Sequence, residues 1–149
     1  MLDGLTPPVI RGFFEARFVG ALSVVRAAAP SLRAGGSIVL TSGNAGQRPG
    51  PGWALGASIC GAMDALTREL ALELAPIRVN AVAPGVTRSP LWNNMSTTDL
   101  AQMYHHIAAT VPVGRLGEAE DVARAYVYLM EQAMATGTVL LVDGGAVLV

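Results

Sequence analysis

The sequence predicts a three-layer α/β protein in which a parallel sheet lies between helices. Helical and strand-like segments alternate along the chain in the order helix–strand–helix–strand–helix–strand, and such alternation produces right-handed crossovers and parallel strands. The composition is apolar, with 52% hydrophobic and 14% charged residues, which suits strands that are buried on both faces. With 149 residues, the chain is expected to form a single domain, 1–149.

The first predicted helix spans residues 7–29. Thr6 stands before Pro7-Pro8, as is typical of a helix N-terminus, and Pro30 ends the helix. Its polar stripe is narrow, so we expect burial on more than one side, against the sheet and against another subunit. Arg17 falls on the apolar side, where an unpaired charge is costly. Arg17 therefore forms an ion pair or clamps an anion or carboxylate in a cleft.

The later elements follow from short apolar runs bounded by Gly or Pro and from longer runs with helical periodicity. They are a strand at 37–42, a helix at 54–75, a strand at 77–83, a short helix at 97–109, a helix at 118–133 and a strand at 138–142. Ser96 and Asp99 resemble a capping box at the start of the short helix. Three strands make a small sheet, and the strand at 37–42 is expected to expose an unpaired edge.

Charge and cysteine content limit the possible partners and location. The net charge is −1 and no block of basic residues occurs, so neither nucleic acid nor a membrane surface is an expected partner. Residues 1–4 contain no basic stretch before an apolar run, so no signal peptide is expected, and no segment is suited to span a bilayer. The single cysteine, Cys60, fits a reducing compartment. The expected location is the cytoplasm.

Five motifs together resemble the short-chain dehydrogenase/reductase family, in its order and spacing. They are GSIVLTS at 36–42, ALELAPIRVNAVAPG at 71–85, PVGRLG at 112–117, EDVA at 120–123 and VDGG at 142–145. The resemblance covers nearly the whole chain. It implies a doubly wound Rossmann-like sheet, of which these residues would supply strands five, six and seven, and NAD(P)-linked hydride transfer as the activity.

The resemblance also implies a cofactor site that these residues do not complete. In the family, a Gly-rich turn in the N-terminal half cradles the dinucleotide pyrophosphate, and no counterpart occurs in the 149 residues. We therefore interpret the chain as a truncated, C-terminal half of the fold. NAD(P) is the implied cofactor, but this part of the fold is not expected to bind it alone.

The family's usual catalytic residues are missing from the positions that the resemblance assigns to them. The position of the general acid/base Tyr falls at Gly56, that of the Lys that lowers the Tyr pKa at Cys60, that of the Ser at Gly43 and that of the Asn at Arg17. The chain contains no lysine. Because a phenol needs a nearby cation to exchange protons near neutral pH, hydride transfer by the usual route is not expected.

Other family positions are occupied by suitable residues. Pro84-Gly85 resembles the turn that lies against the nicotinamide ring, and Ser89 takes the place of a hydroxyl residue that contacts the cofactor. Residues 89–110 resemble the lid over the substrate. The residues expected to line the substrate pocket are Ser42, Trp53, Leu91 and Trp92.

No metal site or reactive thiol is expected. His105 and His106 are adjacent, so on a helix their side chains diverge by about 100° and do not form a metal pair. Cys60 has no His, Lys or Arg at helical spacing and is expected to be a small core residue.

Three functions remain open from the sequence. The first is a non-catalytic oxidoreductase relative that binds a ligand or serves as a structural homo-oligomer. The second is an enzyme with different chemistry in the same cleft, using Arg17, Ser42 or Thr41 as polar groups. The third is a module that complements an N-terminal half on another chain. Self-association is expected through the helices at 7–29 and 54–75, as the family resemblance implies.

Overall fold

The computed structural model describes residues 4–149, and residues 1–3, on which the expected lack of a signal peptide partly rests, lie outside this range. Three parallel strands form one sheet in the order β1 (Ser37–Thr41), β2 (Arg78–Pro84) and β3 (Val139–Val142). Ser37 lies opposite Arg78, and Ala81 lies opposite Val139. The predicted α/β class with a parallel sheet is confirmed.

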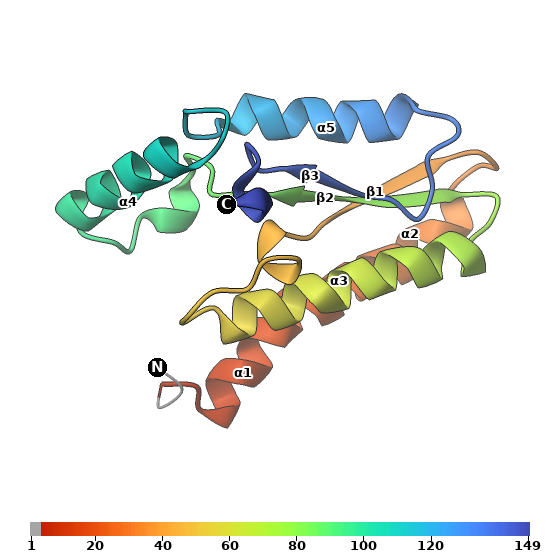
Figure 1. Ribbon diagram of the computed structural model, residues 1–149. Helices are drawn as coiled ribbons and strands as arrows, with labels where there is room; N and C mark the ends of the chain where they lie inside the picture. The colour runs from red at the N-terminus through yellow and green to blue at the C-terminus, as the bar shows by residue number, and fades with distance from the viewer. Residues whose placement is uncertain (1–3) are drawn as a thin grey trace.

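Helices cover both faces of the sheet (Figure 1). They are α1 (Pro7–Phe14), α2 (Gly20–Ala28), α3 (Ala54–Glu73), α4 (Thr97–Thr110) and α5 (Ala119–Glu131). α2 and α3 lie on one face and α5 on the other, while α4 stands beyond the carboxyl end of the sheet (Figure 1). In the part of the chain that the structure describes, no helix is long and apolar enough to cross a membrane.

The first helix departs from the prediction in its middle. Glu15–Val19 form a π-helical turn between α1 and α2, in which the Gly20 N–H bonds the Glu15 carbonyl. Such a turn adds one residue and shifts the following side chains around the helix axis. Thr6 precedes the helix as predicted, but its side chain makes no capping hydrogen bond.

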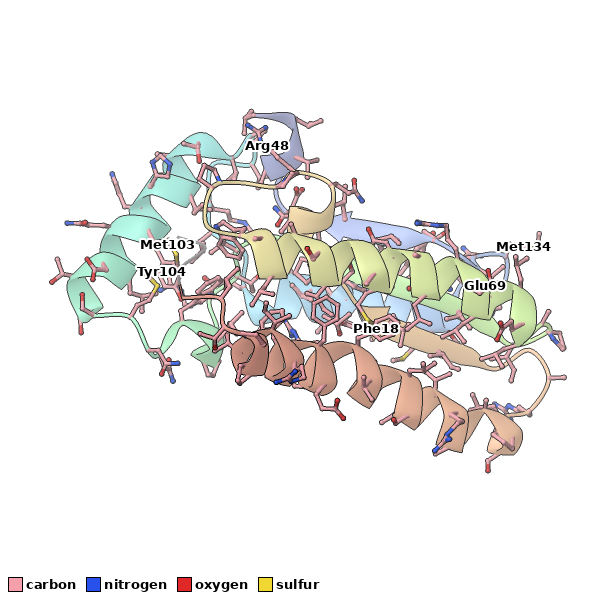
Figure 2. All side chains as sticks on the ribbon, turned by 90° about the horizontal axis from the view of Figure 1, so that it is seen from below. Phe18, Arg48, Glu69, Met103, Tyr104 and Met134 are labelled. Carbon is pink, nitrogen blue, oxygen red and sulfur yellow. The ribbon has the colours of Figure 1, made fainter. Side chains whose placement is uncertain are left out.

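The expected burial of Arg17 is wrong. Its side chain is exposed because the π-helical turn places it beside β1, which pairs only with β2 among the described residues. Phe18, from the same turn, packs on the core instead and lies between α2 and α3 in Figure 2. The turn therefore separates a partly buried aromatic ring from an exposed charge on adjacent residues.

The core has two parts, one on each side of β2. The larger part joins α2 and α3 to β1 and β2 through Val25, Leu40, Met63, Leu70, Ala71, Val79 and Ala81. The smaller part joins the sheet to α5 through Val82, Ala125 and Leu129. Burial on both faces explains why β2 consists largely of small and β-branched apolar residues.

Two polar side chains of β2 fix the carboxyl end of α5. Arg78 donates to the carbonyl oxygens of Leu129 at 2.9 Å and Gln132 at 2.8 Å, and a guanidinium at a helix C-terminus also matches the helix dipole. Asn80 is fully buried and donates to the Ala135 carbonyl at 2.8 Å. These contacts lie at the amino end of the sheet. In open α/β sheets, ligands bind at the opposite end, in the loops that follow the carboxyl ends of the strands.

Candidate functional site

One wall of the candidate site is the segment that follows β2. Gly85 leaves the strand so close to β3 that an added Cβ would lie 2.8 Å from Asp143 Cβ and 2.9 Å from Asp143 Cα. A side chain at this position would require the two backbones to separate. The predicted cofactor residues and two predicted pocket residues line one hollow here, namely Pro84, Gly85, Ser89, Leu91 and Trp92.

The turn after β3 supports this wall and the base of the lid. The Asp143 carboxylate accepts hydrogen bonds from the backbone N–H groups of Gly145 at 2.9 Å and Val147 at 3.0 Å. Gly145 has a φ of 85°, which favours glycine, and packs against Pro112. The motif VDGG therefore closes the sheet and anchors the segment that leads out of α4.

Two ion pairs hold residues near the two ends of 89–110, the segment predicted as a lid, against the start of α5. Arg88 pairs with Glu118 at 3.2 Å, and its guanidinium lies 4.8 Å from the centre of the Tyr104 ring of α4. Arg115 pairs with Asp121 at 2.7 Å. The hydrogen bond from Arg115 holds the pKa of the Asp121 carboxyl well below its usual range, and a backbone hydrogen bond at Glu118 acts in the same direction.

The two tryptophans predicted for the substrate pocket lie together. Their ring centroids are 6.2 Å apart in an edge-to-face arrangement, and the Trp92 indole N–H donates to the Thr87 carbonyl at 2.9 Å. An added Cβ at Gly56 would lie 3.1 Å from Trp53 Cε3. The Trp53 ring thus stands in the space into which a side chain at position 56 would grow.

The second wall is built around Cys60 of α3. Cys60 is buried as expected, and an added Cβ at Gly43 would lie 2.9 Å from its sulfur. An added Cβ at Gly46 would lie 3.0 Å from Cys60 Cβ. The loop after β1 can therefore approach α3 only because it carries glycine at these two positions, and the thiol fills the space beside Gly43.

A serine and a carboxylate join β1 to α3 at this wall. The Ser42 hydroxyl lies 2.5 Å from Asp64 Oδ1 and 3.2 Å from the Cys60 carbonyl oxygen. Asp64 is buried and was not among the residues predicted for the site. In the sequence, Asp64 stands four residues after Cys60 and therefore falls on the same helix face, which could have indicated Asp64 as a site residue. Because Ser42 is engaged by Asp64, it positions the loop as well as lining the cleft.

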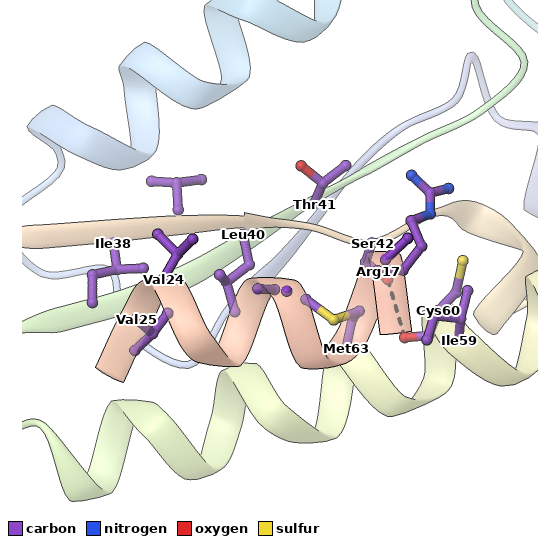
Figure 3. Close-up of a pocket in the computed structure, with 14 residues that line it drawn as sticks. Arg17, Val24, Val25, Ile38, Leu40, Thr41, Ser42, Ile59, Cys60 and Met63 are labelled. Carbon is purple, nitrogen blue, oxygen red and sulfur yellow. Dashed lines mark hydrogen bonds between the residues drawn. The ribbon is translucent and has the colours of Figure 1, made fainter. Parts of the chain in front are cut away.

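Arg17 lines the same cavity as Thr41, Ser42 and Cys60 (Figure 3). The cavity measures about 430 Å³, and the rest of its lining is mostly apolar. Within residues 4–149, Arg17 makes no ion pair or side-chain hydrogen bond, and its guanidinium lies 5.9 Å from the Phe13 ring centre. The ion pair considered for Arg17 is therefore absent from the described part of the chain.

The electrostatic surroundings of Cys60 differ from those that helical spacing alone indicated. Burial raises the pKa of the Cys60 thiol, the nearby Asp64 carboxylate raises it further, and the Arg17 guanidinium acts in the opposite direction. The cation comes from the neighbouring helical segment, so it could not be found by spacing along α3. The thiol is favoured in its neutral form.

No tyrosine is among the described residues that line the cavity of Arg17 and Cys60. The Tyr126 hydroxyl lies 2.6 Å from Thr41 Oγ1, and α5, which carries Tyr126, covers the opposite face of the sheet (Figure 1). Thr41 is thus engaged from that face. Between residues 4 and 149, no cluster of three His, Cys, Asp or Glu side chains could hold a metal ion.

The sheet and its crossovers define a Rossmann-like α/β fold, and the hollow after β2 lies at the carboxyl end of its strands. A family model described as enoyl-(acyl carrier protein) reductase matches residues 5–147. The chain belongs to the short-chain dehydrogenase/reductase family, as its sequence motifs predicted.

Similar proteins agree with this assignment. The short-chain dehydrogenase/reductase ATR9 of Stachybotrys chlorohalonatus is 49% identical over 112 residues, which cover 75% of this chain and 44% of that protein. The chain spans about half the length of the curated relatives it matches. A small-chain dehydrogenase in complex with NADPH has a TM-score of 0.97 and 38% identity, covering 99% of this chain and 68% of that chain.

A further solved structure is also similar to this chain. It is an NADPH-bound short-chain oxidoreductase from Pseudomonas aeruginosa PAO1 that contains an atypical catalytic center. It is 29% identical to this chain with a TM-score of 0.87, covering 97% of this chain and 60% of that chain. NADPH binding and an atypical center thus occur together in a protein of this fold.

Proposed function

We propose that residues 1–149 form the nicotinamide-facing and substrate-facing half of an NAD(P)-linked oxidoreductase fold, and that they do not use the Tyr and Lys route. The contrast between the two walls supports this proposal. The hollow after β2 brings Pro84, Gly85 and Ser89 together, whereas Trp53 occupies the space over Gly56.

The proton chemistry of the second wall supports the loss of the usual route. A general acid must hold its proton near the operating pH and lie within hydrogen-bond reach of the reacting oxygen. Gly56 offers no acid, Gly43 no hydroxyl and Cys60 no ammonium. The raised pKa of the Cys60 thiol keeps it protonated, and burial restricts its access to a ligand.

The fit to a dinucleotide is partial. Gly85 lines the hollow without a side chain, which leaves room for a ring to approach its backbone. The nicotinamide part would be held by Pro84, Gly85 and Ser89, and the cofactor would supply the hydride. The sequence has no Gly-rich turn for the pyrophosphate, so these residues alone should bind dinucleotides weakly.

Isothermal titration calorimetry with NAD, NADH, NADP and NADPH tests this proposal. We expect no saturation of the 149-residue chain below about 1 mM, and no NADPH consumption at 340 nm with ketone substrates. Binding at micromolar concentrations would show that the pyrophosphate is held by residues we have not assigned. Turnover with the pH profile of a phenol general acid would contradict the loss of the Tyr and Lys route.

A second candidate function is different chemistry in the same cleft. Arg17, Thr41 and Ser42 line one cavity, and a related structure has an atypical center. If the 149-residue chain turns over any substrate, this candidate requires the rate to fall in Arg17→Met. An equal rate in Arg17→Met and the unmodified chain would exclude Arg17 from that chemistry.

A third candidate is a structural module that pairs with itself or with an N-terminal half on another chain. It is supported by the open edge of β1 and by exposed apolar residues on the first helical segment, namely Val9, Val19, Leu22 and Val24. We propose a homo-oligomer through 7–29 and 54–75. A monodisperse monomer in analytical ultracentrifugation at micromolar concentration would contradict it. The cytoplasmic location stays a prediction from the sequence.

A further inference from the structure

The cavity beside β1 contains one charged side chain. All ten basic residues of the chain are arginines, and Arg17 is the only charged residue that lines this cavity in the described part of the chain. Its guanidinium has no ionic partner within residues 4–149. The Asp64 carboxylate, which also acts on Cys60, is engaged by the Ser42 hydroxyl. Arg17 is thus available to an anionic ligand.

The second wall also carries an aromatic ring, which lies outside the residues that line the cavity of Arg17. Trp53, Gly56 and Cys60 follow one another at intervals of three and four residues, so they border one face at the start of α3. Trp53 covers Gly56, and the Arg17 side chain extends beside Cys60 and Ser42 in Figure 3. The Trp53 indole remains 44% exposed, so it can still contact a ligand.

The short side chain at position 60 leaves room for Arg17. A thiol ends beside Gly43, whereas a long side chain from the same position would extend toward the cavity that Arg17 now lines. A guanidinium differs from an ammonium because its fork of donors matches a carboxylate in two parallel hydrogen bonds. With Cys60 at the position of the family's lysine and Arg17 as the cation, the wall can therefore hold different ligand oxygens.

We propose that Arg17 is the cation of this cleft and binds the carboxylate of a small ligand whose apolar part lies against the apolar lining of the cavity beside β1. This inference rests on the proposed function, because it names the substrate class of the same cleft. Ser42 and Asp64 act as positioning residues that hold the loop after β1. The rest of the cavity lining is mostly apolar, which favours an acid with an apolar body over a wholly polar one.

Benzoate is a suitable probe because it combines a carboxylate with a planar ring, and benzamide is its uncharged counterpart. Binding to the 149-residue chain is followed by tryptophan fluorescence. We expect benzoate to bind at least about tenfold more tightly than benzamide, and Arg17→Met to remove about this factor. Arg17→Lys should retain part of it. Arg11→Met, which removes an exposed arginine of α1, should leave benzoate binding unchanged.

Equal binding of benzoate in Arg17→Met and the unmodified chain would overturn the assignment of Arg17. Equal binding of benzoate and benzamide, or no binding of benzoate, would overturn the carboxylate as the ligand group. These outcomes leave the proposed nicotinamide-facing wall untouched, because that wall is probed by nicotinamide ligands and not by benzoate.

A titration of Cys60 tests the placement of Arg17 without any ligand. The chain has one cysteine, so the Cβ resonance of a ¹³C-labelled sample reports a single thiol. Because Arg17 lowers the pKa of this thiol, Arg17→Met should raise it, whereas Arg17→Lys and Arg11→Met should leave it close to that of the unmodified chain. An unchanged pKa in Arg17→Met would show that Arg17 lies too far away to act in the cleft.

Discussion

The wall after β2 and the wall around Cys60 differ in what fills the space beside their glycines. At Gly85 the nearest atoms include the backbone of Asp143, and two strands would have to part to admit a side chain. At Gly43 and Gly56 the nearest atoms belong to the side chains of Cys60 and Trp53, whereas Gly46 of the same wall also meets the backbone of Gly61 at 3.1 Å. Side chains can change rotamer or be substituted, so the second wall can be rebuilt at Gly43 and Gly56 while the fold is kept. The first wall has no such freedom.

The largest effect is expected at the backbone-limited wall. Gly85→Ala should lower the free energy of unfolding by about 2–3 kcal/mol, because its Cβ would press on Asp143. Urea denaturation monitored by circular dichroism measures this. The matched control is Gly61→Ala, where an added Cβ meets no atom within 4 Å and should stabilise the helix by up to about 1 kcal/mol. Equal stabilities for the two variants would remove the distinction between the walls.

The next effect concerns the contact that holds the second wall in place. Ser42→Ala leaves the buried Asp64 carboxylate without this hydroxyl and should cost about 2 kcal/mol. Ser58→Ala, at an exposed position of α3, should change stability by no more than about 0.5 kcal/mol. If both variants unfold at the same urea concentration, the contact between Ser42 and Asp64 does not hold β1 to α3.

A smaller effect is expected where a side chain limits the space. Gly43→Ala should cost about 1 kcal/mol in the unmodified chain and less in a Cys60→Ala background, because the sulfur that the new Cβ meets is then gone. The backbone at Gly43 is extended, so alanine introduces no strain of its own. Additive stabilities across this double-mutant cycle would show that the thiol does not fill the space beside Gly43.

The smallest effect is expected from an exposed ion pair at the base of the lid. The pKa of Asp121 is lowered in the folded state by Arg115. Its stabilising effect is therefore fully present above the unfolded pKa, near 3.8, and is lost as the pH falls through the folded pKa. Between pH 7 and pH 3, the melting temperature should fall less in Asp121→Asn than in the unmodified chain. An identical fall would show that the pair contributes nothing to acid sensitivity.

Local patterns predicted most of the fold. Alternating segments gave the parallel sheet, and helix and strand ends differ from their predicted positions by at most two residues. Pro84-Gly85 and Ser89 were assigned from the family resemblance, and they line one hollow because they lie close together along the chain at the end of β2. The π-helical turn at Glu15–Val19 was missed, since one inserted residue leaves no clear trace in an apolar helix.

The second wall was harder to predict because its contacts join separate elements. Arg17 was identified as unusual, but only the structure brings it to Cys60 from another helical segment. Asp64 was overlooked because a carboxylate in a helix is usually exposed, and only its contact with Ser42 explains its burial. Position-by-position resemblance predicted that the usual catalytic residues are replaced, but it did not predict that Trp53 stands in the space over Gly56.

The account depends most on the claim that the wall after β2 still faces a nicotinamide ring. An amide NMR titration of the 149-residue chain with reduced nicotinamide mononucleotide tests it directly. We predict that the largest shifts fall at Gly85, Thr87 and Ser89. Shifts that gather elsewhere, or none at these amides at the highest soluble concentration, would contradict it.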